Sequence, residues 1–321
     1  TAEFSVERTG SSQTRRCDIV AFVNGIPVLV IENKRPTETL KKADSQLIGY
    51  QSEDNIPQLF HFAQLLMTMN RVEARYATVG TPRKFWSTWR DEEDTDEAIS
   101  ASANRPLTSA ELDAVFSGDF APARAYFASM AAESDRSVTE QDRSIFALCR
   151  PERLLDIIRR FTVFDGGVRK IARYQQVFAI REVLARVKQT EDSGKRRGGI
   201  VWHTQGSGKS LTMVFLARVL VFHPNTQACR VLVVTDRLDL EDQLARNFTN
   251  GGAFGSAAAA KKDGEKARVA GARDARHGGE ARLVHEQPEG LGADFSGTDR
   301  LVSIDAGAER LLGVVGMDDL E

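Results

Sequence analysis

Two short apolar segments near the start of the chain are rich in the β-branched residues that favour β-strands. They run from Ile19 to Val23 and from Val28 to Ile31, and they flank Asn24-Gly25, a pair that tolerates the positive φ angles of a tight turn. When two strands pair antiparallel about such a turn, the start of the first lies opposite the end of the second. The pattern therefore predicts a β-hairpin whose open end carries the residues just before position 19 and just after position 31.

One helix and two further strands follow in the pattern. The helix covers TLKKADSQLIGYQ, with Thr37 or Thr39 as its N-cap. The strands cover LFHFAQLLMTMN and ARYATVGTP and are joined by a turn at Asn70-Arg71. Together with the hairpin, these elements predict an α/β fold with a mixed sheet and flanking helices.

An aromatic edge and an acidic run follow these strands. Phe85, Trp86 and Trp89 are residues of the kind that stack on nucleic acid bases, but packing in the local core or against a neighbouring domain is the interpretation that we favour. The acidic run from Asp91 to Glu97 predicts a solvated loop, because it is a block of like charges without the spacing of a calcium loop.

From Leu107 to Val163 the pattern becomes helical. SAELDAVFSG predicts a helix that begins after a Ser cap and ends at Gly118, and PERLLDIIRRF predicts an amphipathic helix with Pro151 at its front. We expect these helices to connect two modules. Three basic residues on the connector, Arg153, Arg159 and Arg160, either contact DNA or are solvated, and solvation is favoured.

Strand, glycine loop and helix alternate in the second half of the chain. IVWH predicts a strand, QGSG a flexible loop and KSLTMVFLARVL an amphipathic helix, and a second apolar strand runs from Val231 to Val234. This order predicts one incomplete lobe built on a parallel sheet, with strands at 200–203 and 231–235 on either side of a crossover helix.

The last segment, residues 251–321, has little apolar periodicity. It holds 13 of the 25 glycines and neither Trp nor Tyr, so its composition predicts disorder. The run RLVSIDAGAERLLGVVGMDDLE is the exception, since it has the composition of a short helix or strand. We therefore divide the chain into a first domain at 1–100, a helical connector at 101–165, a partial lobe at 166–250 and a tail at 251–321.

Composition is that of a globular protein without membrane association. Of its 321 residues, 41% are hydrophobic and 27% charged, and the net charge of -2 neither favours nor excludes nucleic acid binding. No apolar run reaches the roughly 18 residues of a membrane span, and no signal peptide is visible. The three cysteines lie far apart without metal spacing, which predicts reduced thiols in a cytoplasmic protein: Cys17, Cys149 and Cys229.

Three charged residues gather at the open end of the predicted hairpin. Asp18 starts the first strand, and Glu32 and Lys34 end the second, where their spacing of two places them on one face. Carboxylates are ligands for Mg²⁺, a bound metal activates water and neutralises charge on phosphorus, and a lysine stabilises the charged intermediate. The sequence predicts Asp18 and Glu32 as metal ligands and all three residues as catalytic. The alternative is that they are solvated charges at strand ends.

A second pair strengthens this prediction. Gln46 and Tyr50 are four residues apart on the helix directly after the second strand, so they share a face, although an ordinary surface pair is the alternative. Asp, then Glu-x-Lys, then Gln-x-x-x-Tyr resembles the PD-(D/E)xK nuclease domain of RecB-like and type I restriction enzymes. The resemblance implies that Gln46 and Tyr50 belong to a helix that supports cleavage.

The glycine loop predicts a nucleotide site. Backbone amides and the positive end of the following helix cradle phosphates, Lys209 reaches the β and γ phosphates of ATP, and Ser210 ligates Mg²⁺. The usual first glycine of the pattern is replaced by His203. The predicted ATP-binding residues of this loop are Gly206, Ser207, Gly208, Lys209 and Ser210.

The segments on either side of the loop resemble motor motifs. Upstream, Arg173, Tyr174 and Gln175 resemble the Q motif of superfamily 2 helicases, which implies that Gln175 reads adenine; a polar helix start is the alternative. Downstream, TDRLDLEDQ resembles helicase motif Ia, which contacts the DNA backbone. The residues that match that contact are Thr235, Asp236 and Arg237.

Over residues 1–248 the chain resembles the R subunit of type I restriction endonucleases, through WHTQGSGKS, TDRLDLEDQ and the domain order. That resemblance implies a RecA-like motor lobe and ATP-dependent translocation on double-stranded DNA coupled to cleavage, with Mg²⁺ and ATP as cofactors. It also implies modification (methyltransferase) and specificity subunits as partners.

Departures from the family pattern lead to an expectation of truncation. The chain starts at Thr1 rather than Met, and after Asn247 neither the Asp-Glu motif nor a second lobe follows. We therefore expect weak ATP binding without useful hydrolysis. Two alternatives stay open, a P-loop DNA-dependent ATPase whose hairpin is only structural, and a non-catalytic remnant that docks on partner subunits.

Overall fold

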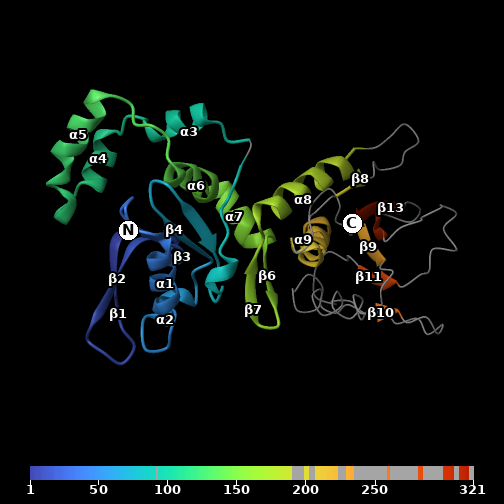
Figure 1. The fold of residues 1–321 in the computed structure, drawn as a ribbon. Helices are drawn as coiled ribbons and strands as arrows, with labels where there is room; N and C mark the ends of the chain where they lie inside the picture. Colours follow the sequence, from blue (N-terminus) through green and yellow to red (C-terminus); the bar gives the residue numbers. More distant parts are fainter. Residues whose placement is uncertain are drawn as a thin grey trace. The chain divides into compact units, whose positions relative to one another are not determined.

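A computed structural model gives the fold, which is mixed α/β as the sequence predicts. The chain divides into two compact units, Thr1–Leu155 and Asp156–Glu321, and Figure 1 shows their helices and strands. No helix among the described residues is long and apolar enough to cross a bilayer. The described residues are 1–91, 93–189, 199–201, 207–222, 229–234, 259–260, 281–284, 299–306 and 311–317.

A five-stranded sheet organises the first unit. Its order is β1-β2-β3-β4-β5, and every neighbouring pair is antiparallel except β3 and β4, which are parallel. The predicted hairpin is confirmed as β2 and β3, with positive φ at Asn24 and Gly25 in its turn. Helix α1, Leu40–Tyr50, forms the crossover that parallel strands require. The strands are β1 Ala2–Glu7, β2 Thr14–Val23, β3 Ile26–Asn33, β4 Leu65–Met69 and β5 Ala74–Ala77.

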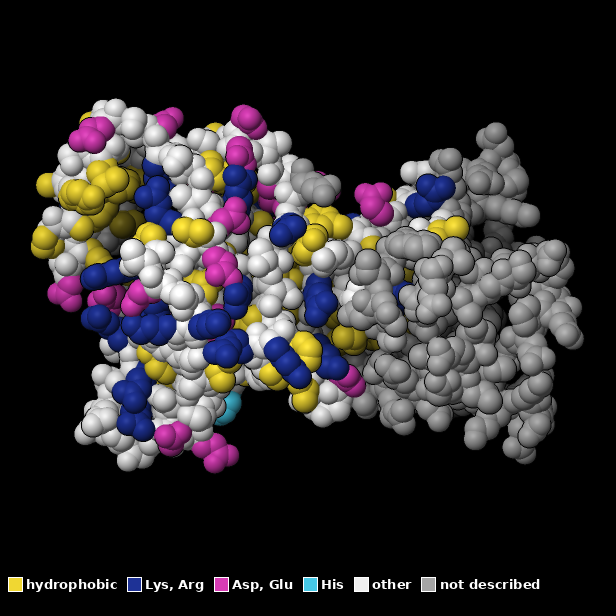
Figure 2. Space-filling model, in the orientation of Figure 1, with side chains coloured by type: hydrophobic (Ala, Val, Ile, Leu, Met, Phe, Trp, Pro, Cys, Tyr) yellow, Lys and Arg dark blue, Asp and Glu magenta, His cyan; other side chains and the backbone are white. Residues whose placement is uncertain are grey.

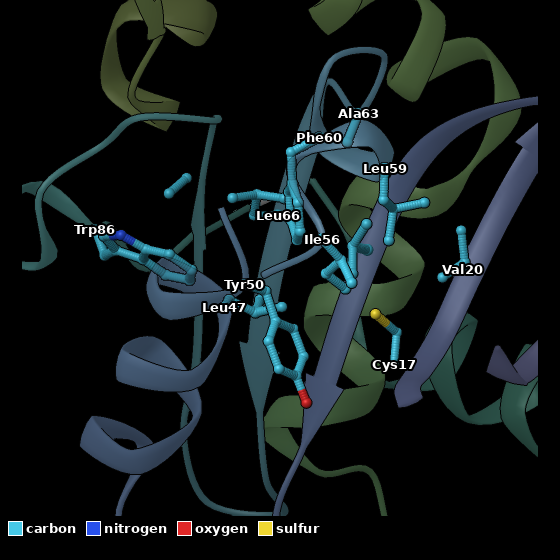
Figure 3. Close-up of a cluster of buried hydrophobic side chains, with 12 residues drawn as sticks. Cys17, Val20, Leu47, Tyr50, Ile56, Leu59, Phe60, Ala63, Leu66 and Trp86 are labelled. Atoms are coloured by element: carbon cyan, nitrogen blue, oxygen red, sulfur yellow. The ribbon is translucent and has the colours of Figure 1, made fainter. Parts of the chain in front are cut away.

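The core of this unit lies between α1 and the sheet (Figure 3). Val20 and Val30 from the hairpin pack with Leu47 of α1 and with Trp86, and all four are buried. Trp89 is buried as well, whereas Phe85 is 52% exposed. The prediction of packing in the local core is therefore confirmed for the two tryptophans, whereas Phe85 does not belong to that core and its packing against a neighbouring domain stays a prediction.

The predicted strand LFHFAQLLMTMN is correct only in its second half. Residues Pro57–Phe60 form the short helix α2, because Pro57 fits the first turn of a helix, and β4 begins only at Leu65. The predicted turn at Asn70-Arg71 is present. There the side-chain oxygen of Asn70 accepts hydrogen bonds at 2.8 Å from the backbone N–H groups of Val72 and Glu73.

The acidic run is a solvated loop only in part. Glu93 and Glu97 are exposed, as predicted, whereas three aspartates of the run pair with arginines in or between α6, Glu140–Cys149, and α7, Pro151–Arg160. Helix α3, Asp96–Ala103, begins within the run. The Asp91 and Arg153 side chains are 3% and 7% exposed and lie 2.8 Å apart. Arg153 therefore does not have either of the two roles that its sequence suggested. The other two ion pairs of the acidic run are Asp94–Arg150, at 2.8 Å, and Asp96–Arg143.

Two helices of the first unit contribute nothing to its core. Neither α4, Ser109–Val115, nor α5, Ala123–Glu133, has a buried residue. Figure 2 shows hydrophobic side chains gathered over them, among them Tyr126, which is 68% exposed. The N-cap of α4 is Thr108, not Ser109, because Thr108 and Glu111 form a capping box, and the helix ends before the predicted Gly118.

The second unit begins with a hairpin and two helices. Strands β6, Thr162–Asp165, and β7, Val168–Ile171, pair antiparallel. Helix α8 spans Tyr174–Val187, and α9, Lys209–Phe222, follows the glycine loop. The prediction that α9 is amphipathic is wrong, because residues 214–217, 219 and 220 are all buried, so apolar side chains surround the helix.

The sheet of this unit is mixed, in the order β10-β11-β9-β12-β13-β8. The two predicted strands are not neighbours in an all-parallel sheet, because the antiparallel pair β12 and β13 lies between β9 and β8. Strands β12 and β13 confirm the prediction of a short helix or strand in the run RLVSIDAGAERLLGVVGMDDLE, whereas β10 and β11 are extended where the composition predicted disorder. The boundaries at residues 100, 165 and 250 stay predictions. The strands are β8 Gly199–Ile200, β9 Cys229–Val234, β10 Ala259–Ala260, β11 Ala281–Val284, β12 Asp299–Ala306 and β13 Leu311–Met317.

The buried Asp91–Arg153 ion pair yields a stability prediction. Changing Asp91 to Ala removes the buried carboxylate that faces Arg153, and we expect the free energy of unfolding to fall by about 3 kcal/mol. Urea unfolding followed by circular dichroism measures this change. The matched control is Asp96→Ala, which breaks the outer Asp96–Arg143 pair and should leave the urea midpoint nearly unchanged, because Asp96 is 57% exposed. Equal losses in the two variants would contradict the assignment.

Candidate functional site

The open end of the β2–β3 hairpin brings Asp18 and Glu32 together. The register pairs Ile19 with Ile31, so Asp18 and Glu32, one residue further on each strand, are opposite one another on one face. Asp18 Oδ2 accepts a hydrogen bond of 2.7 Å from the backbone N–H of Asn33. Glu32 is fully buried, whereas Asp18 is half-buried. The two carboxylates therefore lie side by side at the edge of the core.

Lys34 completes the group. Its ammonium donates a hydrogen bond to Glu32 Oε1, and its side chain is 12% exposed. Its backbone N–H donates to the carbonyl oxygen of Met69 at 2.9 Å, which holds the end of β3 against β4. The structure thus brings together the three side chains that the sequence predicts to converge.

The charge on Glu32 is destabilised by its surroundings. Burial raises its pKa to about 7, and the charge of Asp18 together with a side-chain hydrogen bond to it acts in the same direction, whereas Lys34 lowers the pKa through its hydrogen bond and its charge. Burial also raises the pKa of the neighbouring Cys17 thiol to about 12, so this cysteine is inert. The hydrogen bond between Glu32 and Asp18 requires a protonated Glu32, which donates to the Asp18 carboxylate. When Glu32 is ionised, its second oxygen, Oε2, is buried and has no hydrogen-bond partner in the described part of the chain.

An oxygen of this kind fits a divalent cation. A buried carboxylate oxygen without a donor is costly unless it is paired, and Mg²⁺ takes carboxylate oxygens together with water and phosphate oxygens. The described residues contain no group of three or more His, Cys, Asp or Glu side chains that could hold a metal. Asp18 and Glu32 are the two carboxylates here that could hold such a cation, with its other ligands coming from water or a phosphate.

Gln46 and Tyr50 connect α1 to the hairpin. Gln46 Nε2 donates to the Tyr50 hydroxyl at 2.7 Å, and that hydroxyl donates to the carbonyl oxygen of Arg16 at 3.4 Å. Tyr50 is only 8% exposed, and burial raises the pKa of its hydroxyl. The two residues share a helical face as predicted, and they are not an ordinary surface pair. They hold α1 against β2 close to Asp18.

Sequence reasoning missed two buried polar residues next to this group. Asp44 of α1 and Thr68 of β4 are both fully buried, and Thr68 is the register partner of Glu32. Thr68 Oγ1 donates to Asp44 Oδ1 at 2.7 Å, and Arg75 Nη1 donates to Asp44 Oδ2 at 3.1 Å. A signal was present in the sequence, because Asp44 falls on the apolar stripe of α1, four residues after Leu40 and three before Leu47.

The glycine loop leads directly into α9, which begins at Lys209. Gly208 has a φ angle of +88°, which requires glycine, and a Cβ there would lie 2.9 Å from Gln176 Nε2, so the Gln176 side chain would have to shift. Ser207 Oγ is buried without a hydrogen-bond partner among the described residues, as a group that awaits a ligand would be. Gly206 lies outside the described residues.

Gln176, rather than Gln175, contacts the loop. Its Nε2 donates to the carbonyl oxygen of Gly208 at 3.0 Å and to Thr212 Oγ1 at 3.2 Å. Gln175 is exposed in the first turn of α8. Two adjacent glutamines give no indication in the sequence of which one faces the loop, and only the helical phase decides it. The adenine role of Gln175 stays a prediction, and the predicted DNA contacts Thr235, Asp236 and Arg237 lie outside the described residues.

Two family models match the chain. Residues 1–85 match the model for the N terminus of type I restriction enzyme R proteins, which covers the hairpin and α1. Residues 175–273 match the model of the SWI2/SNF2 ATPase, which covers the glycine loop and α9 and extends into the segment that we predicted to be a disordered tail.

Curated relatives give the same result over a longer stretch. The chain is 31% identical over 243 residues to the type I restriction enzyme HindI endonuclease subunit of Haemophilus influenzae, which covers 73% of this chain and 20% of that protein. It is 28% identical over 243 residues to the putative type I restriction enzyme MjaIXP endonuclease subunit of Methanocaldococcus jannaschii, and the match covers 74% of this chain and 21% of that protein. The type I restriction enzyme SauCOLORF180P endonuclease subunit of Staphylococcus aureus is 24% identical over 255 residues, and the match covers 77% of this chain and 22% of that protein. The chain thus spans about a fifth of the length of these relatives.

The raised pKa of Glu32 predicts how stability depends on pH. A glutamate with a pKa of about 7 when folded and 4.5 when unfolded binds its proton more tightly in the folded chain, so its ionisation costs stability as the pH rises through that window. Glu32→Gln should therefore match the wild type at about pH 4 and exceed it by about 1–3 kcal/mol at about pH 8. Urea unfolding in EDTA at both pH values measures the difference.

The control for this experiment is Glu38→Gln. The pKa of Glu38 is lowered by its hydrogen bond from Lys42, so its ionised form is the favoured one and any pH dependence must have the opposite sign. A gain for Glu32→Gln that did not change with pH would show that Glu32 is not the titrating group.

Proposed function

From the homology of this chain to the endonuclease (R) subunits of type I restriction enzymes over about three-quarters of its length, we propose that it is the DNA-cutting and ATP-binding part of such a subunit. The whole activity would be translocation on double-stranded DNA coupled to cleavage. The proposed partners are double-stranded DNA and the modification and specificity subunits, and the proposed location is the cytoplasm.

The nuclease centre is proposed at Asp18, Glu32 and Lys34. The observation that carries this proposal is that Glu32 Oε2, on the same face as Asp18, is buried and has no partner among the residues that the structure describes. Mg²⁺, when bound, supplies Lewis acidity at the phosphodiester and lowers the pKa of a bound water. Asp18 and Glu32 hold the cation, and their burial at the sheet edge excludes bulk water from one side of it.

Lys34 has a different part in the reaction. Its ammonium lies against Glu32 Oε1, so it would stay close to a phosphate bound to a cation at Oε2. There it orients the attacking water and offsets the negative charge that develops on phosphorus. Gln46 and Tyr50 have an indirect role, because the hydrogen bond between them and the hydrogen bond from Tyr50 to the Arg16 carbonyl hold α1 beside the site.

The nucleotide site is proposed at the loop that precedes α9. The match to the SWI2/SNF2 ATPase and the helix that begins at Lys209 support ATP binding there. Lys209 pairs with the β and γ phosphates, Ser210 contributes a Mg²⁺ ligand, and the backbone amides of the loop bind phosphate oxygens. The wider site would use Gly206, Ser207 and Gly208 for phosphate, Gln175 for adenine, and Thr235, Asp236 and Arg237 for DNA.

Cleavage tests the nuclease proposal. Lys34→Ala, in a complex with modification and specificity subunits, should cut a plasmid at least about 100-fold more slowly than wild type, because the charge that stabilises the transition state is gone. The matched control is Lys42→Ala, which removes an exposed lysine that pairs only with Glu38 in the described part of the chain and should cut normally. Unchanged cutting by Lys34→Ala would leave a DNA-dependent ATPase whose hairpin is structural.

Nucleotide binding is tested separately. Lys209→Ala should bind a fluorescent ATP analogue at least about tenfold more weakly than wild type, because the loop loses its cation for the phosphates. Lys34→Ala serves as the reference and should bind the analogue like the wild type, because Lys34 belongs to the other compact unit. Equal affinities for Lys209→Ala and wild type would contradict the nucleotide site.

A further inference from the structure

Three buried polar side chains form a row beneath α1. Glu32 at the end of β3 and Thr68 of β4 are register partners in a parallel pair, so their side chains are adjacent on one face. Helix α1 packs on both strands and supplies Asp44. All three residues have no exposed surface. Because none of the three is exposed to bulk solvent, the hydrogen bonds of Asp44 and Thr68 are made with protein neighbours.

The direction of the hydrogen bonds in this row is fixed by chemistry. The carboxylate of Asp44 has only acceptors, and it accepts from Thr68 Oγ1 at 2.7 Å and from Arg75 Nη1 at 3.1 Å. A threonine hydroxyl carries one proton. Because Asp44 takes that proton, Thr68 has none left to donate to the neighbouring Glu32. This accounts for a buried Glu32 oxygen that has no donor although a hydroxyl side chain lies beside it in the sheet.

We propose that Asp44 is a positioning residue that reserves the free oxygen of Glu32 for a divalent cation by holding the Thr68 hydroxyl away from it. The inference rests on the proposed nuclease function. Without the Asp44 carboxylate, the hydroxyl of Thr68 turns to the only other acceptor in the row, Glu32 Oε2. A cation then has to displace that hydrogen bond before it binds.

Binding of Mn²⁺ to the chain tests the proposal without any need for cleavage. The signal of free Mn²⁺ in electron paramagnetic resonance gives the dissociation constant. Binding that persists in Glu32→Gln is subtracted, so that only Mn²⁺ bound at Glu32 is compared between variants. Asp44→Ala should weaken that binding about tenfold, the effect of one hydrogen bond to a charged group. The double variant Asp44→Ala with Thr68→Val should restore the affinity to within about twofold of wild type, since no hydroxyl is left to compete.

Thr68→Val alone is the matched control and should bind Mn²⁺ like the wild type. Equal weakening in Asp44→Ala and in the double variant would overturn the inference, because it would mean that Asp44 only supports the fold. Should Asp44→Ala unfold, as judged by circular dichroism, Asp44→Leu replaces it in both arms. If Glu32→Gln bound Mn²⁺ as well as the wild type, the proposed metal site would fail; Glu32-dependent binding unaffected by Asp44→Ala would overturn only the role of Asp44.

Discussion

The register of the β2–β3 hairpin is the constraint on which the candidate nuclease site depends. Side chains alternate between the faces of a strand, so a slip of one residue would turn Asp18 away from Glu32 and expose the apolar residues that pack beneath α1. The irregularity in this pairing lies between Ala21 and Phe22, near the turn, and the pairing of Val20 with Val30 and of Ile19 with Ile31 is regular. Burial of the valines in the core thus fixes the geometry of the carboxylates.

The two candidate sites share a physical arrangement. Each has a buried oxygen without a partner among the described residues, Glu32 Oε2 in one and Ser207 Oγ in the other. In each site a polar group of a neighbouring residue already donates elsewhere: Thr68, the register partner of Glu32, donates to Asp44, and Gln176 donates to the carbonyl of Gly208, the residue after Ser207, and to Thr212. A donor that is already hydrogen-bonded elsewhere does not bond to the unpartnered oxygen. In both candidate sites, hydrogen bonds among neighbouring residues therefore leave the unpartnered oxygen available to a ligand.

Local patterns were sufficient to predict the hairpin and the convergence of Asp18, Glu32 and Lys34, because turn chemistry and strand periodicity act over a few residues. They failed where partners are distant in the chain. The acidic run was interpreted as solvated because its arginines lie about 50 to 60 residues away, and Asp44 was overlooked because its partners Thr68 and Arg75 lie on other elements. Adjacent residues such as Gln175 and Gln176 differ only in helical phase, which packing against α9 decides.

Helices α4 and α5 are the part of the first unit that depends least on the rest. They bury no side chain, and the aromatic contact of Phe116, the C-cap of α4, with Phe127 of α5 at 5.1 Å joins these helices to each other. Selection for a stable fold therefore places little restraint on this stretch. Among homologous proteins, residues 109–133 should be where insertions and deletions accumulate, while the segments on either side keep a constant length.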